Sequence, residues 1–303
     1  MRLVTVEYEG RAGLGVQQED LVFLPALHDA SLPASMLALI EGGETALQAV
    51  RAVFEATPAE AFVPADRTEL LAPIPRPRQN IMCMGLNYAD HVEEASASLG
   101  RDPNLPKHPI VFTKAANSVN APFGEIPYDS EVSDKLDWEV ELGVIIGRAG
   151  RGIPEAEAYD HVFGYTVIND VSARELQRRH KQFFIGKSLS GFCPMGPCIV
   201  TADEIGDPHD LELWCRVNGV EKQHSSTRYQ IFSVAQQIAT LSRGMWLEPG
   251  DILATGTPSG VGFARTPPEY LQPGDVVECE VEGIGAIRNR VVARQGPTSS
   301  FRS

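Results

Sequence analysis

The stretch Asp137–Gly147, with the sequence DWEVELGVIIG, is the clearest strand signal in this chain of 303 residues. Its apolar and β-branched residues predict a β-strand, and the unbroken apolar run 144–146 predicts that both faces of the strand are buried. Side chains alternate along a strand, so Glu139 and Glu141 point to the same side, about 7 Å apart. Two such carboxylates repel each other unless a cation lies between them or one holds a proton. We therefore predict a metal or catalytic site here, with a solvated strand end as the alternative.

A third acid follows the next predicted strand. The run Gly164–Ile168 reads as a strand and leads into Asn169 and Asp170, and residues 171–177 are expected to form a short helix. Asp170 is then either a third ligand or simply the N-terminal acid of that helix. If all three carboxylates bind a metal, the donor set is oxygen only. Oxygen donors favour Mg²⁺, Mn²⁺ or Ca²⁺ over Zn²⁺, and three carboxylates leave about half of an octahedral shell open for substrate and water.

Composition narrows the class of protein. The formal net charge of −14 disfavours nucleic acid and anionic membranes as partners, although a bound cation would still allow an anionic substrate. No apolar run approaches the ~20 residues of a spanning helix, and the chain opens directly into strand-like alternation without a signal peptide. The five cysteines lack zinc-ribbon spacing. We expect buried, reduced thiols and a cytoplasmic protein.

The order of elements predicts an α+β protein that is mainly β, with a small N-terminal α/β domain. Short strands separated by Gly10 and Gly13 open the chain, and Asn218-Gly219 marks a two-residue hairpin. A second hairpin is expected at 276–281 and 286–292, and helices are expected at 33–41, 44–56 and 231–241. The predicted division is an N-terminal domain at 1–72, a proline-rich linker at 73–79, a catalytic domain at 80–295 and a flexible tail at 296–303.

Several motifs, taken together and in order over about residues 80–292, resemble the fumarylacetoacetate hydrolase superfamily. They are Glu139-Val140-Glu141, Asn169-Asp170, the segment 85–91 (GLNYADH), Gly186-Lys187-Ser188 with Pro194–Pro197, and the segment 255–262 (TGTPSGVG). The resemblance is to the group that includes acylpyruvate hydrolases, oxaloacetate decarboxylases and 2-hydroxyhepta-2,4-diene-1,7-dioate isomerases. It implies a mixed β-sandwich roll as the catalytic domain. It also implies Mg²⁺ or Mn²⁺, with Ca²⁺ as a possible substitute, bound by Glu139, Glu141 and Asp170.

A possible general base lies shortly before these ligands. His91 and Glu94 are three residues apart on a predicted short helix, so they share one face, and a carboxylate beside imidazole can orient it and raise its basicity. A surface histidine in an acidic helix is the alternative from spacing alone. The resemblance implies a catalytic His–Glu dyad on a helix that closes over the metal. The segment 92–107 is rich in small residues and suits a lid that becomes ordered on substrate binding.

Other candidates are polar residues in apolar or glycine-rich surroundings. Lys187 is expected to pair with the carboxylates or the substrate, unless its stem packs while its head reaches water. The resemblance places Arg174 and Gln177 at the site, where arginine can grip a carboxylate; a surface helix is the alternative. Gly256 and Thr257 can offer backbone N–H groups and a hydroxyl to an anionic oxygen, although TGTP alone is a weak turn signal.

Together these residues predict a metal-dependent hydrolase that cleaves a C–C bond in a 2,4-diketo acid, an acylpyruvate-type substrate. In this interpretation His91 activates a water, and Lys187 or Thr257 steadies the oxyanion. Oxaloacetate decarboxylation and isomerisation of a 2-hydroxy-dienoate to a 2-keto-enoate are the alternatives, and a metal-stabilised protein without turnover is a fourth. Segments 92–107 and 128–136 are expected to shape the pocket beyond C4. The expected partners are a small anionic 2-keto acid and, from the resemblance, a second copy in a homodimer.

Overall fold

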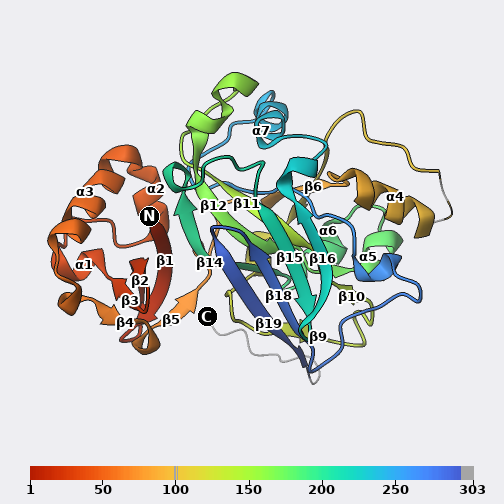
Figure 1. Cartoon of the computed structure of the whole chain (residues 1–303), viewed down its shortest axis with the longest axis horizontal. Coiled ribbons are helices and arrows are strands. Elements are labelled where there is room, and N and C mark those ends of the chain that lie inside the picture. Colours follow the sequence, from red (N-terminus) through yellow and green to blue (C-terminus); the bar gives the residue numbers. More distant parts are fainter. Residues whose placement is uncertain (99, 101, 295–303) are drawn as a thin grey trace.

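The computed structural model describes residues 1–98, 100 and 102–294. Its largest element is a mixed sheet that runs across the molecule (Figure 1), in the order β4-β3-β2-β1-β14-β12-β11-β17-β6-β7, with β5 paired to β1 and β8 to β14. The strands are β1 Arg2–Tyr8, β2 Arg11–Gln18, β3 Leu21–Phe23, β4 Val63–Pro64, β5 Glu69–Leu71, β6 Ile81–Gly85, β7 Ile110–Lys114, β8 Val119–Asn120, β11 Val140–Ile146, β12 Val162–Asn169, β14 Cys193–Thr201 and β17 Ile252–Ala254.

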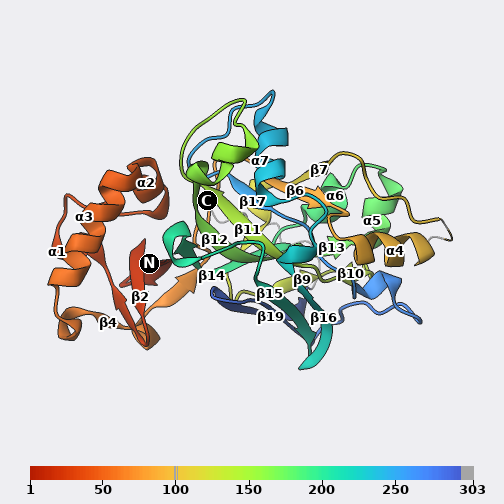
Figure 2. The same ribbon diagram turned by 45° about the horizontal axis from the view of Figure 1, so that its top comes forward.

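A second sheet packs against the middle of the first (Figures 1 and 2) and has the order β16-β15-β18-β19-β9. Its strands are β9 Ile126–Tyr128, β15 Glu212–Val217, β16 Val220–Ser226, β18 Val276–Val281 and β19 Gly285–Ala293. Alternate residues of β15 and β18 are buried, so one face of this sheet closes the core against β11, β12 and β14. The mainly β sandwich and both hairpins predicted from the sequence are confirmed.

Seven α-helices of the described residues lie outside the sheets. They are α1 Pro25–His28, α2 Met36–Glu41, α3 Gly43–Ala56, α4 Ala89–Ser98, α5 Arg174–Arg179, α6 Phe184–Lys187 and α7 Val234–Ser242. The predicted helices at 33–41 and 231–241 exist but begin later, at Met36 and Val234, because Ser35 and Ser233 cap their first turns with side-chain oxygens. Among the described residues, no helix is both long enough and apolar enough to span a membrane.

In the lobe at the left of Figure 1, α1–α3 lie beside β1–β4. This lobe extends the main sheet, because Arg2 and Leu3 of β1 pair with Val200 and Ile199 of β14. Gly10 forms the turn between β1 and β2, with φ of 75°, whereas the predicted break at Gly13 is wrong, because that residue lies inside β2. The division at residue 72 stays a prediction, and the predicted tail at 296–303 lies outside the described residues.

The predicted strand at 137–147 is interrupted at its start. Leu136 and Asp137 form β10, which pairs with β13, Ser172–Ala173, and β11 begins only at Val140. All seven residues of β11 are buried, as the apolar run predicted. The predicted helix at 171–177 is also wrong in its first half, because β13 occupies that position and α5 starts at Arg174. Asp170 is therefore not at a helix N-terminus.

Candidate metal centre and active site

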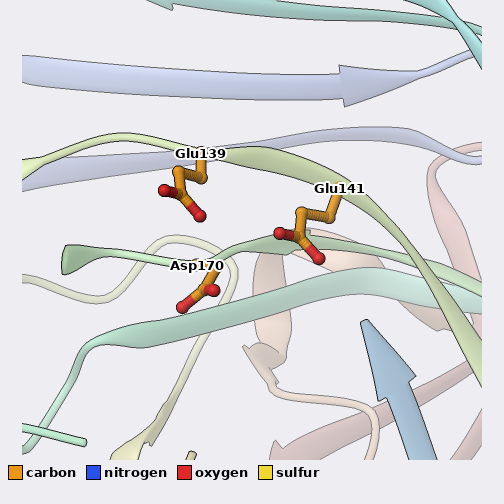
Figure 3. A group of neighbouring side chains, drawn as sticks. All are labelled: Glu139, Glu141 and Asp170. Carbon is orange, nitrogen blue, oxygen red and sulfur yellow. The ribbon is translucent and has the colours of Figure 1, made fainter. Parts of the chain in front are cut away.

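Three buried carboxylates meet where β11 begins and β12 ends. The two strands are antiparallel with Val140 opposite Asn169, so Glu139 and Glu141 at the start of β11 face Asp170, which directly follows β12. One oxygen from each carboxylate lies within 4.8 Å of the others, and Figure 3 shows the three groups turned toward a common point. The exposed fractions of the three residues are 5%, 1% and 0%. This is the carboxylate group predicted from the sequence.

Backbone hydrogen bonds fix the positions of these acids. The Glu139 amide donates to Asn169 Oδ1 at 3.1 Å, and the Asp170 amide donates to the Glu139 carbonyl at 2.9 Å. The Gly256 amide donates to Glu141 Oε2 at 2.9 Å. Gly256 has φ of 100°, and a Cβ there would lie 2.7 Å from the Asn87 Cβ, so only glycine fits this contact.

Three buried cations surround the carboxylates. Lys187 Nζ lies 2.6 Å from Glu139 Oε2 and 2.7 Å from Asp170 Oδ2. On the other side, Lys114 Nζ lies 2.5 Å from Asp170 Oδ1. Arg174 Nη2 lies 2.7 Å from Glu139 Oε1. Lys187 and Arg174 therefore contact protein carboxylates, one of the arrangements predicted for Lys187.

Two members of this cluster were missed by the sequence reasoning. Lys114 ends β7 and is fully buried; its signal is a single charge at the end of the otherwise uncharged segment IVFTK. Asp137 is also fully buried and accepts four hydrogen bonds, from the amides of Trp138, Gly262 and Phe263 and from Arg174 Nε. Asp137 opens the strand-like stretch in the sequence, but nothing local indicates that it binds an arginine 37 residues away.

The pKa values of Glu139 and Glu141 are shifted in opposite directions. Burial opposes ionisation of Glu139, but Lys187, Arg174 and His91 outweigh it and lower its pKa to about 2. Burial together with Asp170 and Glu139 raises the pKa of Glu141 well above its usual value. Burial lowers the pKa of Lys187, but the nearby Asp170 and Glu139 carboxylates raise it by more. The pKa of Lys187 is therefore raised overall, and this lysine remains charged.

These residues fit a hard divalent cation. The donor set is three carboxylates with oxygen atoms alone, and Glu141 is a buried acid whose neighbours are other acids, a state that a cation would relieve. Glu139, Glu141 and Asp170 would hold the ion.

The predicted His–Glu pair is present, with His91 buried and Glu94 partly exposed. His91 Nδ1 lies 2.8 Å from Glu94 Oε1 on α4, and His91 is 6% exposed. His91 is also one of the groups that lower the pKa of Glu139. Gly260 N–H donates to Glu94 Oε2 at 2.9 Å, and Ser259 Oγ donates to Asp90 Oδ2 at 2.6 Å. The helix α4 is therefore tied to the loop after Thr255.

The remaining predicted binding residues mainly support the scaffold. Thr257 Oγ1 donates to the Val140 carbonyl at 2.9 Å and accepts from Gln223 Nε2 at 2.8 Å. Because Gln223 Oε1 also accepts the Val140 amide at 3.0 Å, this pair holds the start of β11. Gln177 accepts a hydrogen bond from Arg174 Nη1 at 3.1 Å. Substrate contacts by Gly256, Thr257, Arg174 and Gln177 stay predictions.

Comparisons with known proteins agree with this geometry. The family model described as "Fumarylacetoacetate (FAA) hydrolase C-terminal" matches residues 80–292. "Oxaloacetate tautomerase YisK" of Bacillus subtilis is 49% identical over 223 residues, covering 74% of this chain and 73% of that protein. "Oxaloacetate tautomerase Fahd2a, mitochondrial" of Rattus norvegicus is 44% identical over 265 residues, with coverages of 87% and 82%.

Among solved structures, maleylpyruvate hydrolase from Sphingobium sp. SYK-6, in complex with manganese (II) ion and pyruvate, superposes with a TM-score of 0.79 and 28% identity. The superposition covers 97% of this chain and 100% of that one. Manganese in a relative of the same fold supports the hard-cation interpretation of the carboxylate group.

Proposed function

The chain belongs to the fumarylacetoacetate hydrolase family, and from this premise we propose that it is a metal-dependent oxaloacetate tautomerase, which interconverts the keto and enol forms of oxaloacetate. The observation that carries the proposal is the hydrogen-bonded His91–Glu94 pair, in which His91 is buried, together with the three buried carboxylates. Tautomerisation moves one proton between C3 and the C2 oxygen. It needs a positioned base and a polarised carbonyl, and it needs no second substrate.

The ion expected at Glu139, Glu141 and Asp170 is Mg²⁺ or Mn²⁺, with Ca²⁺ as a possible substitute. When bound, such an ion polarises the 2-keto carbonyl and makes the C3 protons more acidic. The side chains of the protein carry the proton and stabilise the charges.

His91 is the proton carrier in this scheme. Its Nδ1 faces Glu94, so Nε2 is the ring nitrogen left for the substrate. Nε2 removes a proton from C3, the C–H electron pair forms the C2=C3 double bond, and the carbonyl π pair moves to the C2 oxygen. Delivery of the same proton to that oxygen completes the enol, and Glu94 stabilises the imidazolium in between.

Lys187 has an electrostatic role. Its raised pKa keeps it protonated, so it does not act as a base. It neutralises Glu139 and Asp170 and supplies a fixed positive charge near the developing oxyanion. Lys114 has the corresponding role on the far side of Asp170.

The hydrolase function predicted from the sequence is the second candidate. The maleylpyruvate hydrolase structure favours it, and the same His91–Glu94 pair can deprotonate a water. The relatives named as oxaloacetate tautomerases favour oxaloacetate as substrate, which was predicted from the sequence as an alternative in the form of a decarboxylase. Oxaloacetate decarboxylation shares this substrate and is the third candidate, and isomerisation of a 2-hydroxy-dienoate is the fourth.

The test follows the ultraviolet absorbance of enol oxaloacetate after it is added to protein with Mg²⁺ or Mn²⁺, together with CO₂ release and cleavage of an acylpyruvate. We expect accelerated decay of the enol signal that EDTA abolishes. His91→Ala should slow it about 10²- to 10⁴-fold while Mg²⁺ binding is kept, and Glu94→Gln should slow it less. Acylpyruvate cleavage without enol turnover would overturn the tautomerase assignment in favour of the hydrolase.

The cellular setting is also proposed. A cytoplasmic location and a homodimer stay predictions, testable by fractionation and by light scattering. So does the expectation of a small anionic 2-keto acid as partner, with neither nucleic acid nor membrane.

A further inference from the structure

We propose that Arg178 binds the distal, C4 carboxylate of the substrate and so selects four-carbon diacids over 2-keto acids without that group. This inference rests on the proposed function and deepens it. It starts from a pair of arginines on α5 that share one aromatic ring.

Arg174 and Arg178 lie over the same side chain. Their Cζ atoms are 4.5 Å and 5.3 Å from the centre of the Phe263 ring. Residues four apart lie on one face of a helix, so α5 presents both guanidinium groups on the same side. Arg174 continues inward to Glu139, at 2.7 Å. The contacts therefore lead from a metal ligand through Arg174 and the ring to Arg178.

A hydrogen bond from its own amide to Asp137 fixes the position of Phe263. Asp137 Oδ2 accepts hydrogen bonds from the Phe263 amide at 2.9 Å and from Arg174 Nε at 2.8 Å, so the ring and the inner arginine share one buried anchor. The short helical turn Gly262–Ala264 that carries Phe263 also contacts α4, the helix of His91. Figures 1 and 2 both show α4 and α5 at the same end of the molecule. Arg178 thus lies over a ring whose helical turn contacts α4, the helix that carries the general base.

The two arginines differ in what they bind. Arg174 is buried and is neutralised by Asp137 and Glu139. Arg178 is exposed, and among the described residues no carboxylate forms an ion pair with it. A guanidinium that stacks on a ring but keeps its N–H groups free is ready to bind a carboxylate from solution.

The charge balance of the site calls for such a group. With a divalent ion bound and all four buried carboxylates (Asp137, Glu139, Glu141 and Asp170) ionised, the ion and the three buried cations (Lys114, Arg174 and Lys187) leave one positive charge. The C1 carboxylate of the substrate neutralises this charge. The C4 carboxylate of oxaloacetate then needs a further cation, and Arg178 is the exposed cation that stacks on the ring shared with Arg174.

Arg179 provides the matched control. It is exposed, carries the same charge and is adjacent in sequence, but it points about 100° further around the helix. A general effect of surface charge would be nearly equal for the two arginines, whereas a direct contact would belong to Arg178 alone.

The experiment measures calorimetric binding of malate and lactate to the Mg²⁺-loaded protein, without turnover. The two 2-hydroxy acids differ in the distal carboxylate. We expect the wild-type protein to bind malate about 10- to 100-fold more tightly than lactate, the range for a hydrogen bond to a charged group. Arg178→Met should reduce this ratio to near one, and Arg179→Met should leave it nearly unchanged.

Three results would overturn the proposal: a wild-type ratio near one, an unchanged ratio in Arg178→Met, or an equal reduction in both variants. Tautomerase activity is measured separately. A ratio that depends on Arg178 in a protein that does not turn over the enol would refute the proposed function and leave this inference standing. Enol turnover together with a malate-to-lactate affinity ratio that does not change in Arg178→Met would support the proposed function and refute this inference.

Discussion

Replacement of Asp137 by asparagine tests whether the buried charge network holds the site together. Asp137 Oδ1 accepts from the amides of Trp138 and Gly262, at 2.8 and 2.7 Å, and Oδ2 accepts from the Phe263 amide and from Arg174 Nε, at 2.9 and 2.8 Å. Asparagine keeps one acceptor oxygen and puts an NH₂ group in place of the other. Whichever way the amide turns, two N–H donors face another donor.

The expected cost can be worked out from these contacts. Each buried donor left without an acceptor costs about 1–3 kcal/mol, and breaking a buried ion pair costs about 3–5 kcal/mol. These contributions overlap at Arg174, so we expect Asp137→Asn to lower the free energy of unfolding by about 3–5 kcal/mol. The same change should weaken catalysis, because it frees Arg174 and Phe263 together.

Urea unfolding followed by circular dichroism measures this loss. Asp251→Asn is the control: Asp251 is also buried, but its carboxylate accepts from the Glu248 amide alone among the described residues, a bond that asparagine can keep. Burial already raises the pKa of Asp251, so loss of its charge should change the free energy of unfolding by less than about 1 kcal/mol. An equally small change for Asp137→Asn would refute the reasoning.

Two further predictions concern the metal and the lid. Burial and two neighbouring acids raise the pKa of Glu141, so Mg²⁺ must displace a proton from it on binding. The affinity of the protein for Mg²⁺ should therefore rise with pH until Glu141 is ionised even without the metal. The heat of Mg²⁺ binding measured by calorimetry should also depend on the ionisation enthalpy of the buffer, which takes up the released proton. Heats independent of the buffer would contradict this. Amide hydrogen exchange in α4 should slow on addition of Mg²⁺ and oxalate, and Ser259→Ala should speed it in the free protein by removing the bond to Asp90; equal exchange with and without oxalate would show that the predicted lid is simply ordered.

The sequence predicted those parts of the site that are local in the chain. Glu139 and Glu141 are encoded by strand alternation, and His91 and Glu94 by helical spacing, so both pairs could be found without knowledge of the fold. The two hairpins and the burial of β11 follow equally local patterns. The errors at Gly13 and at residues 171–173 arose where strand pairing in the folded protein outweighed local preference.

The cationic half of the site could not be predicted in the same way. Lys114 binds Asp170 across 56 residues, and Asp137 binds Arg174 across 37. Nothing in the spacing of these residues specifies the pairing, because it is created by the order of strands in the sheet. A buried lysine or aspartate becomes recognisable only when the fold shows that no water reaches it.

The same constellation can serve three reactions, and the choice among them depends on what surrounds the substrate. Proton shift, decarboxylation and hydrolysis all place negative charge on the C2 oxygen. The electrons come from the C3–H bond in the proton shift and from the C3–C4 bond in the other two reactions. Hydrolysis also requires a water beside the base. His91 is 6% exposed and lies on α4, which is bonded to the loop after Thr255 through Asp90 and Glu94, an environment that excludes bulk water and favours proton transfer. Decarboxylation converts the C4 carboxylate to neutral CO₂, so a guanidinium such as Arg178 on that carboxylate would stabilise the starting anion and oppose its loss. A closed site with Arg178 at the C4 carboxylate, as proposed above, would therefore direct the common chemistry toward tautomerisation.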